Sequence, residues 1–138
     1  MKQIELASQR LLGVDGMPGL LSAGWEIFEL VIAVAAASAD QSADMYPAFT
    51  FARGSAVSGR NAIAFAPSMP ACYAPSGALE PGTGDVYQVA DAVAGLASAL
   101  SARLRDAAGH AADAGDCAAC ELAAGHADQI SGLLARGM

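Results

Sequence analysis

The stretch DVYQVADAVAGLASALSARLRDAAG, which spans residues 85–109, decides the fold class. Its large apolar residues follow one another at spacings of three or four, which is the period of one face of an α-helix. Asp85 stands before this run as an N-cap, and Gln88 three residues later is typical of a capping box. The stretch therefore predicts an amphipathic helix. Its buried face would carry Val86, Val89, Val93, Leu96, Leu100 and Leu104.

Residues 20–39, LLSAGWEIFELVIAVAAASA, are apolar on nearly every side of a helix. Their number matches the ~20 residues that a membrane span requires. However, Glu26 and Glu29 lie inside the stretch, where acids in a bilayer would be costly, and no basic cluster flanks it to orient insertion. We predict instead a helix buried in a bundle, from about residue 18 to 39, with its two carboxylates solvated or paired with arginine.

The segment 46–66 is compatible with two structures. Its alternating apolar residues allow a small hairpin at 48–66, which would make the fold α+β. A helix also fits, because Pro47 would lie in its first turn and Pro67 would follow its end. We favour the helix because an isolated two-stranded hairpin has little to pack against. One face of that helix would carry Phe51, Ser55, Ser58, Ala62 and Phe65.

The remaining segments complete an all-α pattern. Residues 3–12 favour a first helix, and Asp116 is expected to cap a last helix that includes Leu134. Four prolines and three glycines in residues 67–84 indicate a long irregular connector. We expect a single helical domain over residues 1–138, folded as a compact bundle of four to five helices.

Alanine dominates the composition, at 34 of 138 residues, whereas Leu, Ile, Val and Phe together contribute 29. Alanine is the best helix former, but burying it removes far less apolar surface than burying leucine. The core should therefore be modest, and apolar helix faces should remain for a second copy of the chain to cover. We expect a homodimer whose contact surface lies on one of the last two helices.

Charge and cysteine content indicate which classes of partner and which cellular compartment the sequence favours. Seven basic and fourteen acidic residues give a net charge of −7, which disfavours nucleic acid and anionic membranes as partners. The first residues lack the basic start and apolar run of a secretory signal. Three cysteines are an odd number for structural disulfides. We expect a cytoplasmic protein.

Few residues are suited to catalysis. Lys2 is the only lysine, and no phosphate-binding loop of the G-x-x-x-x-G-K-S/T type occurs. His110 and His126 are the only histidines, and no G-x-S-x-G motif accompanies them. The leading hypothesis is therefore a non-enzymatic helical module that works through protein contacts, most simply as a homodimer. Enzymatic activity is the less favoured hypothesis.

One cluster in the last third of the chain suits metal binding. Cys117 and Cys120 are three residues apart and share a helix face, and His110 and His126 would complete a Cys₂His₂ zinc site. All four residues come from one segment, however, and His126 falls roughly on the far side of a straight helix from the thiols. We favour the thiols as small core residues and expect no cofactor. A zinc-binding or sensing protein is the alternative function.

Small-molecule binding is a further alternative, with a pocket between the second helix and the connector. Aromatic residues gather in these parts of the sequence, and Arg53 or Arg60 would meet an anionic group of the ligand. Neighbouring aromatic side chains more often form part of a core. The residues that would line the pocket are Trp25, Phe28, Tyr46, Phe49, Arg53, Arg60 and Tyr73.

Overall fold

The computed structural model describes residues 2–70 and 85–135, which form helices joined by turns, with no strand among them. The all-α prediction is therefore confirmed, and the hairpin alternative for residues 48–66 is wrong because a single helix covers most of that segment. The helices are α1 (Lys2–Gly13), α2 (Gly16–Ser38), the short 3₁₀-helix η1 (Ala39–Gln41), α3 (Tyr46–Ala64), α4 (Val86–His110) and α5 (Ala114–Leu134).

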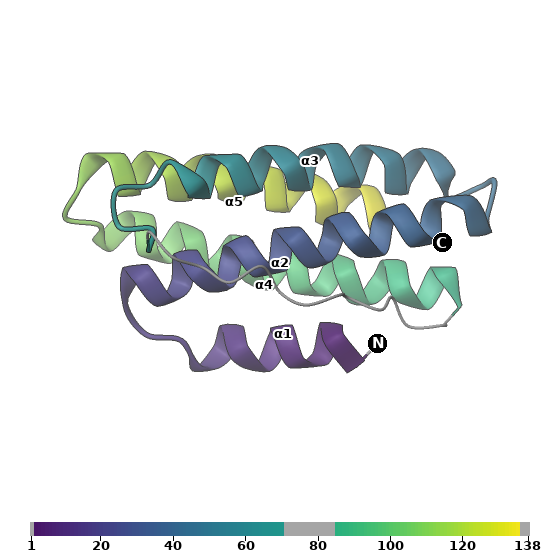
Figure 1. Cartoon of the computed structure of the whole chain (residues 1–138), viewed down its shortest axis with the longest axis horizontal. Coiled ribbons are helices and arrows are strands. Elements are labelled where there is room, and N and C mark those ends of the chain that lie inside the picture. Colours follow the sequence, from purple (N-terminus) through teal and green to yellow (C-terminus); the bar gives the residue numbers. More distant parts are fainter. Residues whose placement is uncertain (1, 71–84, 136–138) are drawn as a thin grey trace.

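Helices α2, α3, α4 and α5 form a four-helix bundle, and α1 lies along its side against α2 and α4 (Figure 1). Around the bundle, α3 packs between α2 and α5, and α5 packs on α4. Helices α2 and α5 run in one direction and α3 and α4 in the other, so that neighbouring helices are antiparallel (Figure 1). Because α4 starts at the end of the bundle opposite to where α3 ends, the chain needs a long connection between them.

Helix α2 has more buried residues than any other helix, as its apolar sequence predicts. Together with η1 it forms a stretch, Gly16–Gln41, that is long and apolar enough to cross a membrane by length and composition alone, with a mean hydropathy of 1.8. In the bundle, 61% of its apolar 18-residue window is buried. A helix in the middle of a soluble bundle meets the same criteria.

Gly59 lets α3 pack closely on α2. A methyl group on Gly59 would lie 2.5 Å from Cζ of Phe28, and Phe28 is fully buried. The glycine is therefore needed to make room for an aromatic ring, because its own position is inside a helix and not in a turn. Its weak helix propensity, about 1 kcal/mol below that of alanine, is offset by the apolar surface that the ring of Phe28 buries.

The start of α5 differs from the expectation. Asp113 is the N-cap, and its Oδ1 accepts hydrogen bonds from the backbone N–H groups of Gly115 (2.7 Å) and Asp116 (3.2 Å). Asp116, which we expected to be the cap, is 4% exposed and accepts hydrogen bonds from the backbone N–H (2.9 Å) and the hydroxyl of Ser68. A buried carboxylate requires such partners, and this one ties the chain after α3 to α5.

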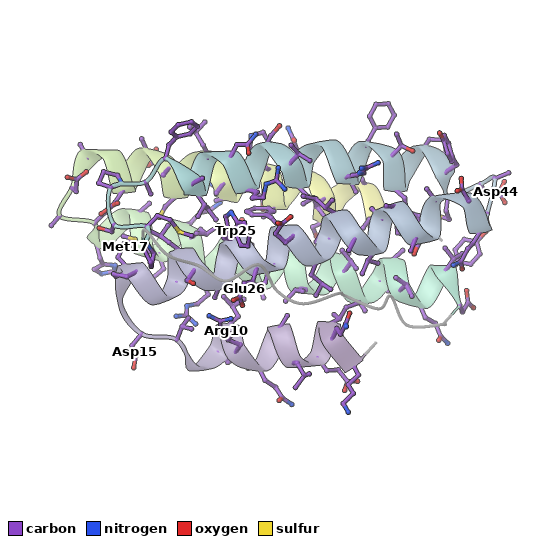
Figure 2. All side chains as sticks on the ribbon, in the orientation of Figure 1. Arg10, Asp15, Met17, Trp25, Glu26 and Asp44 are labelled. Carbon is purple, nitrogen blue, oxygen red and sulfur yellow. The ribbon has the colours of Figure 1, made fainter. Side chains whose placement is uncertain are left out.

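Both carboxylates of α2 are paired with arginine, in agreement with the prediction. Arg10 of α1 pairs with Glu26, and their side chains point toward one another between the two helices (Figure 2). One turn further along α2, Nη1 of Arg60 in α3 lies 2.9 Å from Oε2 of Glu29. These two acids therefore fasten α2 to its neighbours instead of forming a paired-carboxylate site.

Arg103 of α4 holds the end of α1. Its guanidinium donates to the backbone oxygens of Leu11 and Val14, the second at 2.8 Å. The last carbonyl groups of a helix have no partner inside the helix, so the arginine satisfies groups that would otherwise depend on water. Leu11 is 1% exposed, which places the apolar side of α1 against the bundle.

Candidate interaction surface

The structure does not bring the four predicted zinc ligands together. His126 lies on the flank of α5 that faces α3, where its Nδ1 is 3.3 Å from Oε1 of Gln129, a residue that also accepts a hydrogen bond from Ser55 of α3. His110 ends α4, and its Nδ1 lies 2.8 Å from the backbone oxygen of Asp106. Within residues 2–70 and 85–135, no group of three or more His, Cys, Asp or Glu side chains is arranged to hold a metal ion.

The two thiols of α5 have the surroundings of small core residues. Cys120 is fully buried, and its Sγ lies 3.7 Å from Sδ of Met17. Burial, together with the charge of Asp116, raises the pKa of Cys120 to about 11. Cys117 is half-buried, and desolvation and the nearby Glu121 raise its pKa as well. Both shifts are opposite in direction to the lowered pKa that marks a reactive cysteine.

Most aromatic residues of the predicted small-molecule pocket fill the core. Phe28 and Phe49 are fully buried and Trp25 is 7% exposed, so these rings pack against protein and have little surface for a ligand. Arg60, expected to meet an anionic group, is engaged by Glu29. The remaining members of the predicted set are Tyr46 and Arg53, which are exposed, and Tyr73, which lies outside the described residues.

One surface hollow, of about 330 Å³, lies where the start of α2 meets the end of α4. Met17, Arg103 and His110 contribute to its lining. Its charged groups already have partners in the fold, since Arg103 binds backbone carbonyls of residues 11 and 14 and His110 contacts Asp106. The hollow therefore adds no new chemistry to the end of the bundle.

A second hollow is an open groove of about 520 Å³ between α3 and α5. Its walls are largely apolar, and the hydrogen bond between the Ser55 hydroxyl and Oε1 of Gln129 (3.1 Å) crosses it. Gly132 adds no side chain, and a Cβ atom placed there would have no neighbour within 4 Å. The groove is lined by Phe51, Ser55, Gln129, Gly132 and Leu133.

This groove belongs to a larger surface of apolar, small and polar residues, which we call the α3/α5 face. Three large apolar side chains on it are strongly exposed to solvent: Phe51 (65%), Phe65 (87%) and Leu122 (61%). Small and uncharged polar residues occupy the positions between them. The face consists of Phe51, Ser55, Ser58, Ala62 and Phe65 from α3 and its C-cap, and of Leu122, Gly125, His126, Gln129, Gly132 and Leu133 from α5.

Formally charged side chains lie beside the α3/α5 face and not on it. In α3, Arg60 pairs with α2, and Arg53, seven residues earlier, lies on the same side of the helix. In α5, Asp128 pairs with Arg105 of α4, and Glu121, again seven residues earlier, shares that side. Among the described residues, the face therefore carries no Asp, Glu, Lys or Arg, although the chain has a net charge of −7.

The sequence predicted only part of this surface. The helical spacing of Phe51 and Phe65 was visible, and a contact surface on one of the last two helices was expected, but the contribution of α3 was not. Comparison with known proteins adds no relative: no family model, curated protein or solved structure matches the chain.

Proposed function

We propose that this protein is a non-enzymatic helical module that works by associating with a second copy of itself. The observation that carries the proposal is the α3/α5 face, on which Phe51, Phe65 and Leu122 stand in solvent with no charged residue between them. Single exposed apolar side chains are common on monomers, whereas a face that gathers three large ones among uncharged residues is a candidate contact site. Association would remove these side chains from water.

The roles of the polar residues support a non-enzymatic module. Asp116, the buried acid nearest to the thiols, is satisfied by Ser68, and the two acids of α2 are paired with arginine. The thiols keep their protons at neutral pH, because burial raises the pKa of Cys120 and desolvation raises that of Cys117. These groups stabilise the bundle in their present positions, and catalysis would require that some of them be free to bind a substrate.

The size of the α3/α5 face also supports dimer formation. Helix α3 has 19 residues, which gives a length of about 28 Å at ~1.5 Å per residue. Two neighbouring helices at a spacing of ~8–10 Å present a surface about 20 Å wide. Two such faces would bury about 1,100 Å² in total, just above the ~1,000 Å² minimum for a biological interface and below the ~1,200–2,000 Å² of stable complexes, as expected of a dimer that dissociates on dilution.

Sedimentation velocity tests this function. We expect the full chain to sediment as a dimer at high micromolar concentration and to dissociate on dilution, because the face is small for an obligate dimer. Raising the salt concentration should leave the dimer intact or strengthen it, because the acidic copies repel each other and salt screens that repulsion. A monomer at every concentration would contradict the proposal.

A further inference from the structure

We infer that the two copies associate about a two-fold axis, so that Phe65 of each copy inserts into the α3/α5 groove of the other. This inference rests on the proposed function and specifies the contact that carries it. Two features of the same face are involved: a protruding aromatic side chain at one end and an apolar groove at the other. Self-complementary surfaces of this kind form closed dimers, because each copy supplies both halves of the contact.

Phe65 is the protruding half of the contact. Its side chain is 87% exposed, the highest value among the large apolar residues of segments 2–70 and 85–135. The backbone around it is fixed: Phe65 is the helical C-cap of α3, its N–H donates to the carbonyl of Ile63, and the following Ala66 is 5% exposed. The ring is therefore held out from the bundle by a rigid support, which reduces the entropy lost when a partner binds it.

The groove between Phe51 and Leu133 is the receiving half. Its volume of about 520 Å³ lies within the ~300–1,000 Å³ of small-molecule sites, which leaves ample room for one phenyl ring. The apolar walls provide contacts for the ring, and Gly132 leaves open space where any other residue would place a side chain. Aromatic side chains that enter such pockets commonly dominate the binding energy of an interface.

The spacing of the two halves fits a two-fold axis. Phe65 and Ser55 are ten residues apart in α3, which corresponds to about 15 Å along the helix. An axis that crosses α3 midway between them would exchange the two positions, so that both contacts form at once. The residues near such an axis, Ser58, Ala62 and Gly125, are small and allow the two copies to approach closely.

Charge favours a second copy over a charged partner. Each chain carries a net charge of −7, so two copies can approach closely only through a surface from which the acids are absent. Glu121 and Asp128 lie on the flank of α5 toward α4, outside the α3/α5 face. The described residues of the face offer no formal charge for a strongly basic or acidic partner to pair with. An identical face meets no electrostatic repulsion there.

Two variants of the α3/α5 face test the inference by sedimentation, each beside a matched control. Phe65→Ser removes the protruding ring, and Gly132→Leu adds a side chain to the groove at a position where a Cβ atom has no neighbour within 4 Å. Leu12→Ser removes a side chain that is 78% exposed on α1, and Gly95→Leu adds one at an equally open position of α4. We expect each variant of the face to weaken the dimer about tenfold or more, and both controls to match the natural chain.

The outcomes separate the inference from the function it rests on. A natural chain that dimerises while Phe65→Ser or Gly132→Leu leaves the dimer unchanged would overturn the inference and leave the proposed function standing. A natural chain that is monomeric throughout would overturn both. Circular dichroism checks that each variant folds.

Photocrosslinking provides an independent test if a variant fails to fold. Phe65 is replaced by p-benzoylphenylalanine, and isotope-labelled and unlabelled copies are mixed before irradiation. We expect crosslinks between a labelled and an unlabelled copy, at residues 51–55 or 129–133. Crosslinks confined to one chain, or to other parts of the partner, would overturn the inference.

Discussion

At the scale of single residues, Gly59 is the described glycine with the least room for an added methyl group. Gly59→Ala would place a methyl group 2.5 Å from a ring atom of Phe28, which is fully buried and cannot move aside. We expect the free energy of unfolding to fall by about 1–3 kcal/mol, as in other overpacked cores. Gly95→Ala is the control: its site is open, and the better helix propensity of alanine should raise stability by up to about 1 kcal/mol. Urea titration measures both, and a stabilised Gly59→Ala would contradict the packing described here.

The pKa of Cys120 predicts how stability responds to alkaline pH. Burial raises this pKa from 9.0 to about 11, so the thiol ionises more readily in the unfolded chain than in the folded one. The stabilisation from this group is therefore complete below pH 9.0 and is lost as the pH rises toward 11. In Cys120→Ala, urea titrations across this pH window should show a smaller loss of stability than in the natural chain. An equal loss in both proteins would mean that the thiol is not buried as described.

Asp116 shows where residue-level prediction from the sequence reaches its limit. Asp113 and Asp116 are both suitable N-caps for the last helix, and nothing nearby in the sequence distinguishes them. The choice depends on Ser68, which lies 48 residues away in the chain and donates two hydrogen bonds to Asp116. A contact of that range cannot be inferred from local propensity, and the cap was therefore assigned to the wrong aspartate.

At the scale of whole elements, the attachment of α1 depends on Arg103. Arg103→Met keeps the length of the side chain but removes its hydrogen bonds to the carbonyls of Leu11 and Val14. We expect a loss of about 1.5–3 kcal/mol, the range for hydrogen bonds from charged groups, and faster amide hydrogen exchange confined to α1. Arg105→Met is the control, because its pair with Asp128 is about half exposed on both sides, and exposed ion pairs contribute at most about 1 kcal/mol. Equal effects of the two variants would contradict this role of Arg103.

Helix α4 and helix α3 illustrate which elements the sequence predicts well. In α4 the helical spacing of the apolar residues and the N-cap residue both predict the same helix. In the structure, Asp85 accepts a hydrogen bond from the backbone N–H of Tyr87, as an N-cap does. In α3 the spacing of the apolar residues fitted both a strand and a helix, and the helix was favoured because a hairpin would have had no sheet to join. The side of α3 that faces outward was not predictable, because it is decided by where α2 and α5 pack and not by α3 itself.

At the scale of the whole molecule, the alanine content explains both the bundle and the face that it leaves uncovered. Small residues allow the helices to pack closely, and the buried residues of α5 include Ala119, Ala123, Ala124 and Ala127. Each of them removes little apolar surface from water, so the bundle gains less from its core than a leucine-rich one would. The larger apolar side chains of α5 are not all directed inward, and Leu122 is 61% exposed on the α3/α5 face.

Most of the candidate site followed from three-dimensional packing and not from motifs. The predicted ligand sets were assembled from residue types that can bind metals or anions, but such residues function together only if the fold places them together. His126 and the thiols of α5 lie on different sides of one helix, and most of the aromatic residues considered for a pocket became core. An interaction surface has no residue motif, and its most useful sign in the sequence was the pair of phenylalanines at helical spacing.

Native mass spectrometry of the full chain is the decisive test of self-association, because it reports the oligomer and any retained metal or ligand in one spectrum. At high micromolar concentration we predict a species of twice the 13.8 kDa chain mass, with no added mass from an ion or small molecule. Phe65→Ser at the same concentration should give chiefly the single chain. A natural chain that appears only at 13.8 kDa, or a dimer that the Phe65→Ser change leaves intact, would contradict self-association through the α3/α5 face.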